Sequence, residues 1–415
     1  MAKCDGLPLA LELAAHRASA STLEEIESEL DDPLDALERA TLPNAESLRN
    51  AIARSWRLLD PEARSVLEYV SVFRGSFSRA SAEAVVAPSG ASTVLKSLAA
   101  LCRASLVLHE EALGKSRFRL LASTRQYADG MLETKEKANA ELRFVAHCEE
   151  LATEMSSRNA RRELQLEEAN LLHGFHVARC LKGTAATKIA LALDDLYSVR
   201  ASPLVQSHLL DTVLQDVLAE RIEASAADAA ELWLRKGRAE RRAGRFEPAR
   251  AALDRCRSSH GAASSTIARA LQTSGRIALI TGNYPAAEQW LREAHDCAVA
   301  CKDPVATVRA LRDLADLKRD RGLAETALAL ARSTDPLEEA YASWSLGRVL
   351  RAERALSQAQ VHFRRAQTLA QAEGEAYLDA LLTTSLGRLA LLLGDYPLAS
   401  ERFQDALAKH RSAGN

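Results

Sequence analysis

Residues that break helices are scarce in this chain of 415 residues. Glycine (18) and proline (11) together make up about 7% of it, against about 12% in an average protein, and aromatic residues make up 5%. Sandwiches, barrels and alternating β/α enzymes need many more turn residues. Good helix formers such as alanine, leucine, glutamate and arginine are abundant instead. The composition therefore predicts an all-α protein and excludes most enzyme folds.

The chain also lacks an excess of charge, an ordered set of cysteines and long apolar runs. Its 54 Lys and Arg against 56 Asp and Glu give a net charge of −2, which argues against a protein that coats nucleic acid or membranes. Its seven cysteines are odd in number and scattered, as expected of reduced thiols in a cytosol. No apolar run approaches the roughly 20 residues of a membrane-spanning helix. We expect a cytoplasmic protein with no membrane partner.

No pattern of catalytic or metal-binding residues is present in the sequence. Cys297 and Cys301 are four residues apart, but only His295 is near them, and zinc sites need three or four converging ligands. Small buried side chains are the better interpretation of these cysteines. His173 and His176 are the nearest pair of histidines, and we expect them to face solvent or to pack between helices. The sequence predicts that the chain is not an enzyme and holds no metal or cofactor.

Local charge divides the chain into four segments. Residues 1–42 carry a net charge of −7 and are expected to form two helices. The following segments, 43–133, 134–224 and 225–415, carry +3, −3 and +5. These four segments are our predicted domains, and the overall balance of charge is an average over them.

Segment 43–133 shows three helices followed by a small β-hairpin, which is the layout of a winged helix. Asp60-Pro61-Glu62 is a strong helix start, because it combines a capping carboxylate, a proline in the first turn and an acid near the helix N-terminus. We expect this helix to end at Gly75. The other expected elements are helices at 80–86 and 94–102, strands at 105–109 and 117–121 around a turn at 110–116, and a helix capped by Ser123.

The last 190 residues repeat with spacings of 32 to 40 residues. A small residue recurs in the first helix of each repeat, at Gly237, Gly275, Ala315, Gly347 and Gly387. Seven residues later comes the turn between paired helices, at Gly244, Gly282, Gly322, Arg354 and Gly394. The second helix then carries an alanine (Ala249, Ala287, Ala327, Ala359, Ala399) and, four residues on, a packing residue (Leu253, Leu291, Ala331, Phe363, Phe403). Small residues let two helices approach closely while the larger residue fills the gap beside them.

This register is that of tetratricopeptide (TPR) repeats, lengthened from 34 to about 40 residues. It predicts an α-solenoid of about five repeats over 225–415. The third repeat is the weakest, with a shortened second helix. Upstream, residues 166–221 are interpreted as one or two degenerate repeats that cap the solenoid, within a helical linker at 134–224.

Arginines recur on the face of the repeats that is expected to line the concave groove. The predicted groove residues are Arg238, Arg241, Arg276, Arg309, Arg312, Tyr341, Trp344, Arg348, Arg351 and Arg388. One interpretation is a row of guanidinium groups that binds an acidic peptide or an acidic protein surface through bidentate contacts with carboxylates. The other is a solvated groove in which Asp313, Asp316 and Asp320 neutralise much of the positive charge.

Several motifs resemble bacterial STAND-type signal-transducing ATPases and the LuxR-like or AfsR-like regulators related to them. Residues 6–11 read Gly-Leu-Pro-Leu-Ala-Leu, and this motif resembles the start of the helical lid in that family. The winged-helix pattern and the TPR array follow in the family's order. The resemblance implies that Pro8 is the remnant of a nucleotide contact, that residues 1–42 are a lid remnant and that the array is a sensor.

The family's P-loop domain is missing, because no GxxxxGK[ST] motif precedes the lid motif. The sequence is therefore expected to be the C-terminal part of a larger regulator, or to work with an NTPase domain or subunit that precedes it. We expect a non-catalytic sensing arm that binds a protein or peptide through the TPR groove and relays the binding through the winged helix. The alternatives are a transcriptional regulator that binds DNA through the winged helix and a subunit that completes an ATPase in trans.

Overall fold

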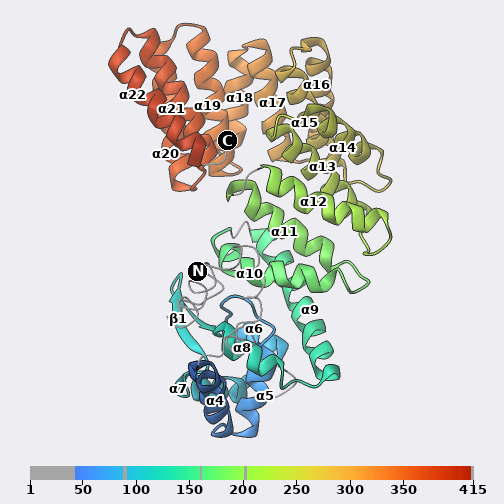
Figure 1. Cartoon of the computed structure of the whole chain (residues 1–415). Coiled ribbons are helices and arrows are strands. Elements are labelled where there is room, and N and C mark those ends of the chain that lie inside the picture. Colours follow the sequence, from blue (N-terminus) through green and yellow to red (C-terminus); the bar gives the residue numbers. More distant parts are fainter. Residues whose placement is uncertain (1–42, 87–90, 159–160, 201–202, 413–415) are drawn as a thin grey trace. The chain divides into compact units, whose positions relative to one another are not determined.

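The computed structural model describes residues 43–86, 91–158, 161–200 and 203–412 (Figure 1). By their internal contacts, the residues group into two compact units, 1–193 and 194–415, and each unit is described by itself. Within the described residues the only sheet has two strands, and the remaining elements are helices. The expected all-α fold is therefore confirmed. The predicted domain borders stay predictions; the two compact units meet inside the segment 134–224.

The first unit begins with the winged helix. Its helices are α4 (Pro43–Arg57), α5 (Pro61–Val70), α6 (Arg79–Val85), α7 (Ala91–Arg103) and α8 (Ala122–Asp129). Asp60 caps α5 as expected, because its carboxylate accepts a hydrogen bond from the backbone N–H of Ala63 at 2.6 Å and proline occupies the first helical position. The core of this unit holds Phe73 stacked on Phe77, with ring centroids 4.5 Å apart.

The hairpin of the winged helix is displaced from its predicted position. Strand β1 (Leu108–Ala112) pairs antiparallel with β2 (Lys115–Arg119), so the turn contains only Leu113 and Gly114, both with positive φ. The alternation of apolar residues before His109 suggested an earlier strand, but Leu106 and Val107 are both buried in the loop that precedes β1. Phe77 adds a short bridge to Phe118 on the other edge of β2.

Two helix ends in this unit also differ from the prediction. Helix α5 ends at Val70 rather than at Gly75, because the chain turns at Ser71 and brings Phe73 into the core. Helix α8 begins at Ala122 after Leu121, so the predicted cap Ser123 lies inside the first turn and is buried. The hydroxyl of a serine caps a helix only where the serine's own backbone is extended, as at Ser78 before α6.

Helices α9 (Thr134–Arg158), α10 (Arg161–Ala178) and α11 (Ala185–Arg200) follow the winged helix. Helices α9 and α10 pack against each other, and Gly174 on α10 leaves room for Cys148, because a Cβ at Gly174 would lie 2.8 Å from the Cys148 sulfur. Phe144 on α9 is fully buried and meets Phe73 edge-on, with centroids 5.3 Å apart. The core of the winged helix therefore continues into α9.

In the second unit, α12 (Pro203–Leu218) precedes five helix pairs (Figure 1). The pairs are α13 (Ala226–Arg242) with α14 (Phe246–Ser258), α15 (Ser264–Ile280) with α16 (Tyr284–Ala300), α17 (Pro304–Lys318) with α18 (Arg321–Ala331), α19 (Pro336–Ala352) with α20 (Leu356–Ala372), and α21 (Ala376–Leu392) with α22 (Tyr396–Ser412). The two helices of each pair pack closely, as do the successive first helices α13, α15, α17, α19 and α21. The second helices instead pack between first helices, so the first helices form the inner, concave layer of the array.

The small and large residues of the predicted repeat register meet in the structure. A Cβ added at Gly275 would lie 2.6 Å from Leu291, and one at Gly347 would lie 2.6 Å from Phe363. Gly237 faces Leu253 in the same way at 2.7 Å. The five recurring alanines are all buried. Close approach of the paired helices therefore depends on these glycines, as the register predicts.

The third repeat departs from the register at its turn. Helix α17 ends at Lys318 and α18 begins at Arg321, so the predicted turn residue Gly322 lies inside α18. Arg319 adopts the left-handed conformation instead, with φ 54°. Ala324 and Ala331 are fully buried where other repeats carry larger residues, and α18 has only 11 residues. Smaller side chains thus accompany a shorter helix and a tighter turn.

Among the described residues, no helix is both long enough and apolar enough to cross a membrane.

Candidate functional site

The arginines of the predicted groove lie on the first helices, and half of them contact the first helix of a neighbouring repeat. Arg309 on α17 binds Glu338 on α19, with its Nε donating at 2.8 Å. Arg348 on α19 donates to Asp316 on α17 at 2.8 Å, and Arg276 on α15 lies 3.9 Å from Asp313 on α17. These ion pairs join successive first helices, so they stabilise the stacking of the repeats.

The acids that neutralise the groove are partly those expected and partly others. Asp313 contacts both Arg276 and Arg312, and Asp316 contacts Arg348. Asp320 does not enter the groove, because its carboxylate caps α18 at the backbone N–H of Leu323. Glu338, which was not singled out in the sequence, is buried and receives Arg309 and Arg312. Burial raises its pKa, but these arginines outweigh burial and keep its pKa below the usual value.

The two predicted aromatic residues lie beneath arginines. The guanidinium of Arg312 lies 5.2 Å from the ring centroid of Tyr341, and that of Arg348 lies 5.0 Å from the ring centroid of Trp344. The indole N–H of Trp344 donates to Ser385 on α21 at 2.9 Å. Both cations are therefore held on aromatic faces, an arrangement that suits guanidinium groups.

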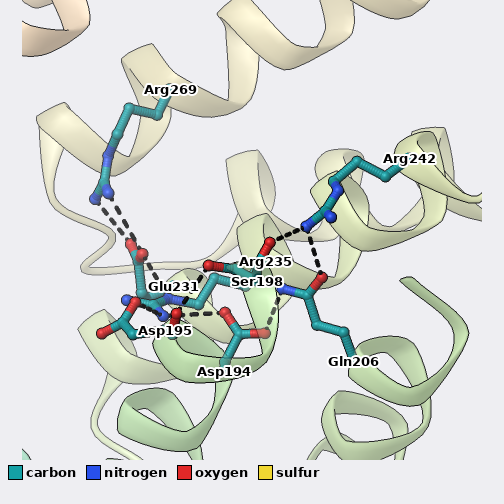
Figure 2. Close-up of polar contacts among 8 residues, drawn as sticks. All are labelled: Asp194, Asp195, Ser198, Gln206, Glu231, Arg235, Arg242 and Arg269. Carbon is teal, nitrogen blue, oxygen red and sulfur yellow. Dashed lines mark hydrogen bonds and ion pairs between the residues drawn. The ribbon is translucent and has the colours of Figure 1, made fainter. Parts of the chain in front are cut away.

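Where the unit begins, arginines and acids form a network of ion pairs and hydrogen bonds (Figure 2). Arg235 on α13 bridges Asp194, Asp195 and Glu231, and Arg269 on α15 binds Glu231 at 2.8 Å. Burial raises the pKa of Glu231, but Arg235 and Arg269 outweigh burial and hold it at about 2. This network ties α11, α13 and α15 together with two arginines for three carboxylates, and burial raises the pKa of Asp194.

Arg242, at the end of α13, contacts both this region and a residue of α21. It donates to the carbonyl of Ser198 at 2.6 Å and lies near the amide of Gln206 (Figure 2). Its guanidinium also lies 5.9 Å from the ring centroid of Tyr377 on α21. The C-terminal end of α13 and the N-terminal end of α21 therefore lie near each other.

Four of the predicted groove arginines have no ion pair and no hydrogen-bond partner within the described part of the chain: Arg238, Arg241, Arg351 and Arg388. The Nε atoms of Arg241 and Arg351 are buried. Burial and the nearby guanidinium groups of Arg309 and Arg269 lower the pKa of Arg238 to about 9. Burial and Arg276 lower the pKa of Arg241 to about 10. The predicted ladder thus separates into arginines with acidic partners and arginines without them.

In the winged helix, the basic residues of the hairpin are engaged by acids. Lys115 at the hairpin tip binds Glu163 on α10 at 2.8 Å, and Arg119 lies 3.6 Å from Glu110 on the paired strand. Helix α7, which corresponds to the recognition helix of a winged helix, offers only Lys96 and the terminal Arg103. The surface that would contact nucleic acid therefore carries little free positive charge.

Arg117 of the hairpin is buried in a polar network with α10. It donates to the hydroxyl of Ser76 at 2.8 Å and to the carboxylate of Glu167 at 2.7 Å. Asn170, one turn along α10, accepts from the backbone N–H of Gly75 at 2.8 Å and donates to the carbonyl of Ser76 and to Glu167. Arg117, Glu167 and Asn170 are each at most 5% exposed. No local pattern of residues predicts this network, because its members are separated by up to 95 residues.

The remaining predicted residues divide as follows. Pro8 lies outside the described residues. No group of three or more His, Cys, Asp or Glu side chains in the described part of the chain is arranged to hold a metal ion. Cys297 and Cys301 are only partly buried, rather than buried as expected, and their sulfurs contact the backbone carbonyls of Ser264 and Ala298. His173 packs 5.6 Å from the ring centroid of Phe144, and burial together with Arg74 lowers its pKa to about 4.

Residues 59–133 match the family model of the winged helix-turn-helix domain. A Mycobacterium tuberculosis protein described as an HTH-type transcriptional regulator is 29% identical over 240 residues, which are 54% of this chain and 27% of that protein. An uncharacterized protein of the same organism is 34% identical over 154 residues, which are 35% of this chain and 39% of that protein. The chain thus matches about a quarter of the length of the first relative.

Among solved structures, the chain resembles a Signal Transduction ATPase with Numerous Domains (STAND) protein with a tetratricopeptide repeat sensor from Pyrococcus horikoshii. The TM-score is 0.53 at 16% identity, and the match covers 97% of this chain and 59% of that one. This likeness is one of fold. Together, the comparisons show that the chain contains a winged helix-turn-helix domain and that its fold, with the helical-repeat array, is similar to that of a STAND protein.

Proposed function

We propose that the chain is a non-catalytic, signal-sensing arm of a cytoplasmic regulator and that its solenoid binds an acidic segment of a partner protein. The observation that carries this proposal is the pair Arg238 and Arg241 on α13. Neither guanidinium group makes an ion pair or a hydrogen bond within the described chain. The carboxylates of Glu231 and Glu338 act on Arg238 only at longer range, as does that of Asp313 on Arg241. Desolvating a cation without a partner is costly, whereas an incoming carboxylate would repay that cost through charge-assisted hydrogen bonds.

The neighbouring arginines support the same ligand chemistry. Arg276, Arg309 and Arg312 lie on the next first helices and already hold carboxylates of this chain. The spacing of successive repeats would present Arg238 and Arg241 to an extended acidic segment that runs along the inner layer. The Arg276, Arg348 and Arg388 set suggested by the register is a less sharp probe, because the first two already bind Asp313 and Asp316.

The test uses fluorescence anisotropy with the full chain and a labelled octaglutamate peptide, with an octaglutamine peptide as the uncharged control. The double variant Arg238→Gln and Arg241→Gln is expected to bind octaglutamate at least about tenfold more weakly, since each charge-assisted pair contributes on the order of tenfold or more. The matched control replaces Arg250 and Arg292 with Gln, because these exposed arginines lie on the second helices α14 and α16. Equal loss in both variants, or no binding to octaglutamate at physiological salt, would reject the proposal.

The route by which binding reaches the winged helix is part of the proposal. The buried contacts of Arg117 with Glu167, and of Gly75 with Asn170, join the hairpin side of the winged helix to α10. A winged helix held this way suits an internal connecting module, in which a shift of α10 is transmitted without repacking. Hydrogen exchange of residues 115–119 with and without bound octaglutamate tests the relay, which predicts altered protection there.

A second candidate function is DNA binding through the winged helix, followed by transcriptional regulation. The family match of residues 59–133 and the M. tuberculosis relative described as a regulator favour it. The ion pairs of the basic hairpin residues with acids of this chain count against it, because phosphate contacts need free cations on the recognition helix and wing. A gel shift with a duplex at two salt concentrations decides between them; binding that weakens steeply with salt would support the DNA-binding alternative.

A further inference from the structure

A cavity of about 850 Å³ opens where the inner layer of the solenoid meets the turns inside the helix pairs. Its wall comes from the C-terminal ends of α15, α17, α19 and α21 and from the turns after α17 and α19. Arg238 and Arg241, which carry the proposed partner binding, do not line it. We call it the rim cavity.

The charge of the rim cavity is strongly unbalanced. Four arginines line it (Arg319, Arg348, Arg351 and Arg354), and Asp316 is its only acidic side chain. Arg348 uses that acid at 2.8 Å. Within the described chain the side chains of the other three arginines make no ion pair and no hydrogen bond, and the Nε of Arg351 is buried. Burial, Arg388 and Arg348 lower the pKa of Arg351. Three guanidinium groups without partners therefore line one open cavity, and Arg319 and Arg354 are exposed residues.

The backbone adds an independent observation. At the turn inside each helix pair, the left-handed position is held by Gly244, Gly282 and Gly394 in the first, second and fifth repeats. In the third and fourth repeats it is held by Arg319 (φ 54°) and Arg354 (φ 65°), and these are the two turns that line the rim cavity. A side chain in this conformation costs about 1–2 kcal/mol relative to glycine. The fold thus retains arginine at the two places where a cation would reach the cavity.

The position of these arginines near helix C-termini does not by itself account for them. A cation near a helix C-terminus is stabilised by about 0.3–1 kcal/mol through the helix dipole. That gain does not exceed the cost of the left-handed backbone, and it does not explain Arg351, whose Nε is buried inside α19. A ligand that supplies negative charge accounts for all three.

The rest of the wall is apolar. Leu279, Leu317, Val349 and Leu392 line the cavity together with Tyr284, which is 60% exposed. The volume lies within the range of about 300–1,000 Å³ typical of small-molecule sites. A ligand that fits this wall carries an anionic group at one end and an apolar or aromatic group at the other.

We propose that the rim cavity binds a small phosphate monoester, with its phosphate held by Arg319, Arg351 and Arg354 and its apolar group against the leucines. A phosphate monoester carries −1.5 to −2 charges near neutral pH and accepts bidentate hydrogen bonds from guanidinium groups, whereas a carboxylate supplies only one charge. The site shares Arg348 and Arg351 with the predicted groove but neither Arg238 nor Arg241, so it does not depend on the proposed function.

The proposal is tested by isothermal titration calorimetry of the full chain with phenyl phosphate and with inorganic phosphate. Phenyl phosphate is expected to bind about fivefold or more tightly than inorganic phosphate, because the ring buries apolar surface. The test variant is Arg319→Gly with Arg354→Gly, which removes two cations and places glycine where the backbone favours it. This variant is expected to fold at least as well as the parent chain and to bind phenyl phosphate about tenfold more weakly or worse.

The matched control is Lys302→Gly, which removes a cation from another left-handed position (φ 56°) outside the cavity. It is expected to keep the parent affinity. No heat with millimolar phenyl phosphate overturns the proposal, as does an equal affinity in the double glycine variant. Much tighter binding of a phosphotyrosine peptide than of phenyl phosphate would assign the site to a phosphorylated protein and would also overturn it. Binding of octaglutamate by the double glycine variant separates this result from the proposed function.

Discussion

Arg117 in the winged helix and Arg351 in the solenoid both have buried nitrogen atoms, but their surroundings differ. Arg117 lies against Glu167 and the carbonyl of Ser76, so its charge is matched. Arg351 has a buried Nε with no partner in the described chain, and the charged groups that affect it most are the arginines 388 and 348. The same residue type therefore serves as a structural link in one unit and as an unmatched charge in the other. Burial alone does not separate these roles, whereas the presence of an acidic partner does.

The largest effect on stability is expected when the acid is removed from the ion pair of Arg117 and Glu167. Glu167→Ala leaves the guanidinium of Arg117 buried without its carboxylate and removes a partner of Asn170. We expect a loss of about 3–5 kcal/mol in the free energy of unfolding, measured by urea titration followed by circular dichroism. The control Glu150→Ala, at an exposed position of α9, should change stability by no more than about 0.5 kcal/mol.

A second variant separates charge from packing at the same place. Replacing both partners, with Arg117→Met and Glu167→Leu, removes the buried charges together and should recover much of the lost stability. If Glu167→Ala proves neutral, or if the double variant is no better than the single one, the network does not link α10 to the hairpin as described.

The next test compares the ion pair of Arg117 and Glu167 with an apolar contact inside a helix pair of the solenoid. A Cβ at Gly347 would lie 2.6 Å from the ring of Phe363, which is fully buried. Gly347→Ala should therefore cost about 1–3 kcal/mol through overpacking, measured by the same titration. Gly387→Ala is the matched control, because its Cβ would lie 3.0 Å from Phe403, whose ring is 36% exposed and has room to move. Equal losses would show that helix propensity, rather than close approach, governs these positions.

Glu231 extends the comparison to pH. Its folded pKa of about 2 lies below its usual value of about 4.5, because Arg235 and Arg269 outweigh its burial. A depressed carboxylate pKa gives stability that is fully present above about pH 4.5 and is lost as the pH falls towards 2. We expect Glu231→Gln to lose roughly 1–2 kcal/mol less free energy of unfolding than the parent chain between pH 5 and pH 2.5, measured by urea titration. The control Glu247→Gln, at an exposed acid of α14, should leave this pH dependence of stability unchanged.

These contacts also show how far the sequence alone reaches. The repeat register placed Gly275 against Leu291 and Gly347 against Phe363, because close helix packing demands a small residue at a fixed spacing. The cap of α5 at Asp60 was equally predictable, since it depends on three adjacent residues. The hairpin and the end of α5 were misplaced, because burial of Val107 and Phe73 depends on tertiary contacts that local alternation does not report.

The residues of the groove were predictable from the sequence, but which of its arginines form ion pairs was not. The register identified the arginines, yet the sequence held no sign that Glu338 would neutralise Arg309 while Arg238 and Arg241 stayed unmatched. Pairing of charges between repeats depends on how far each first helix is shifted along its neighbour. Asp320 lies in the turn after α17, which ends at Lys318, and its carboxylate caps α18 instead of entering the groove. The rim cavity had one local signal, an arginine at position 354 where the register calls for glycine.

The smallest expected effect concerns the unmatched arginine itself. Arg351→Met keeps the aliphatic part of the side chain and removes a cation that has been partly taken out of water without a partner. Stability should therefore stay unchanged or rise by up to about 1 kcal/mol, in contrast to the large loss at Glu167. Arg348→Met is the matched control one turn earlier on α19; it removes the partner of Asp316, so it should cost about 1 kcal/mol. A loss at Arg351 equal to that at Arg348 would mean that Arg351 is a structural residue like Arg117, and the distinction between matched and unmatched arginines would then fail.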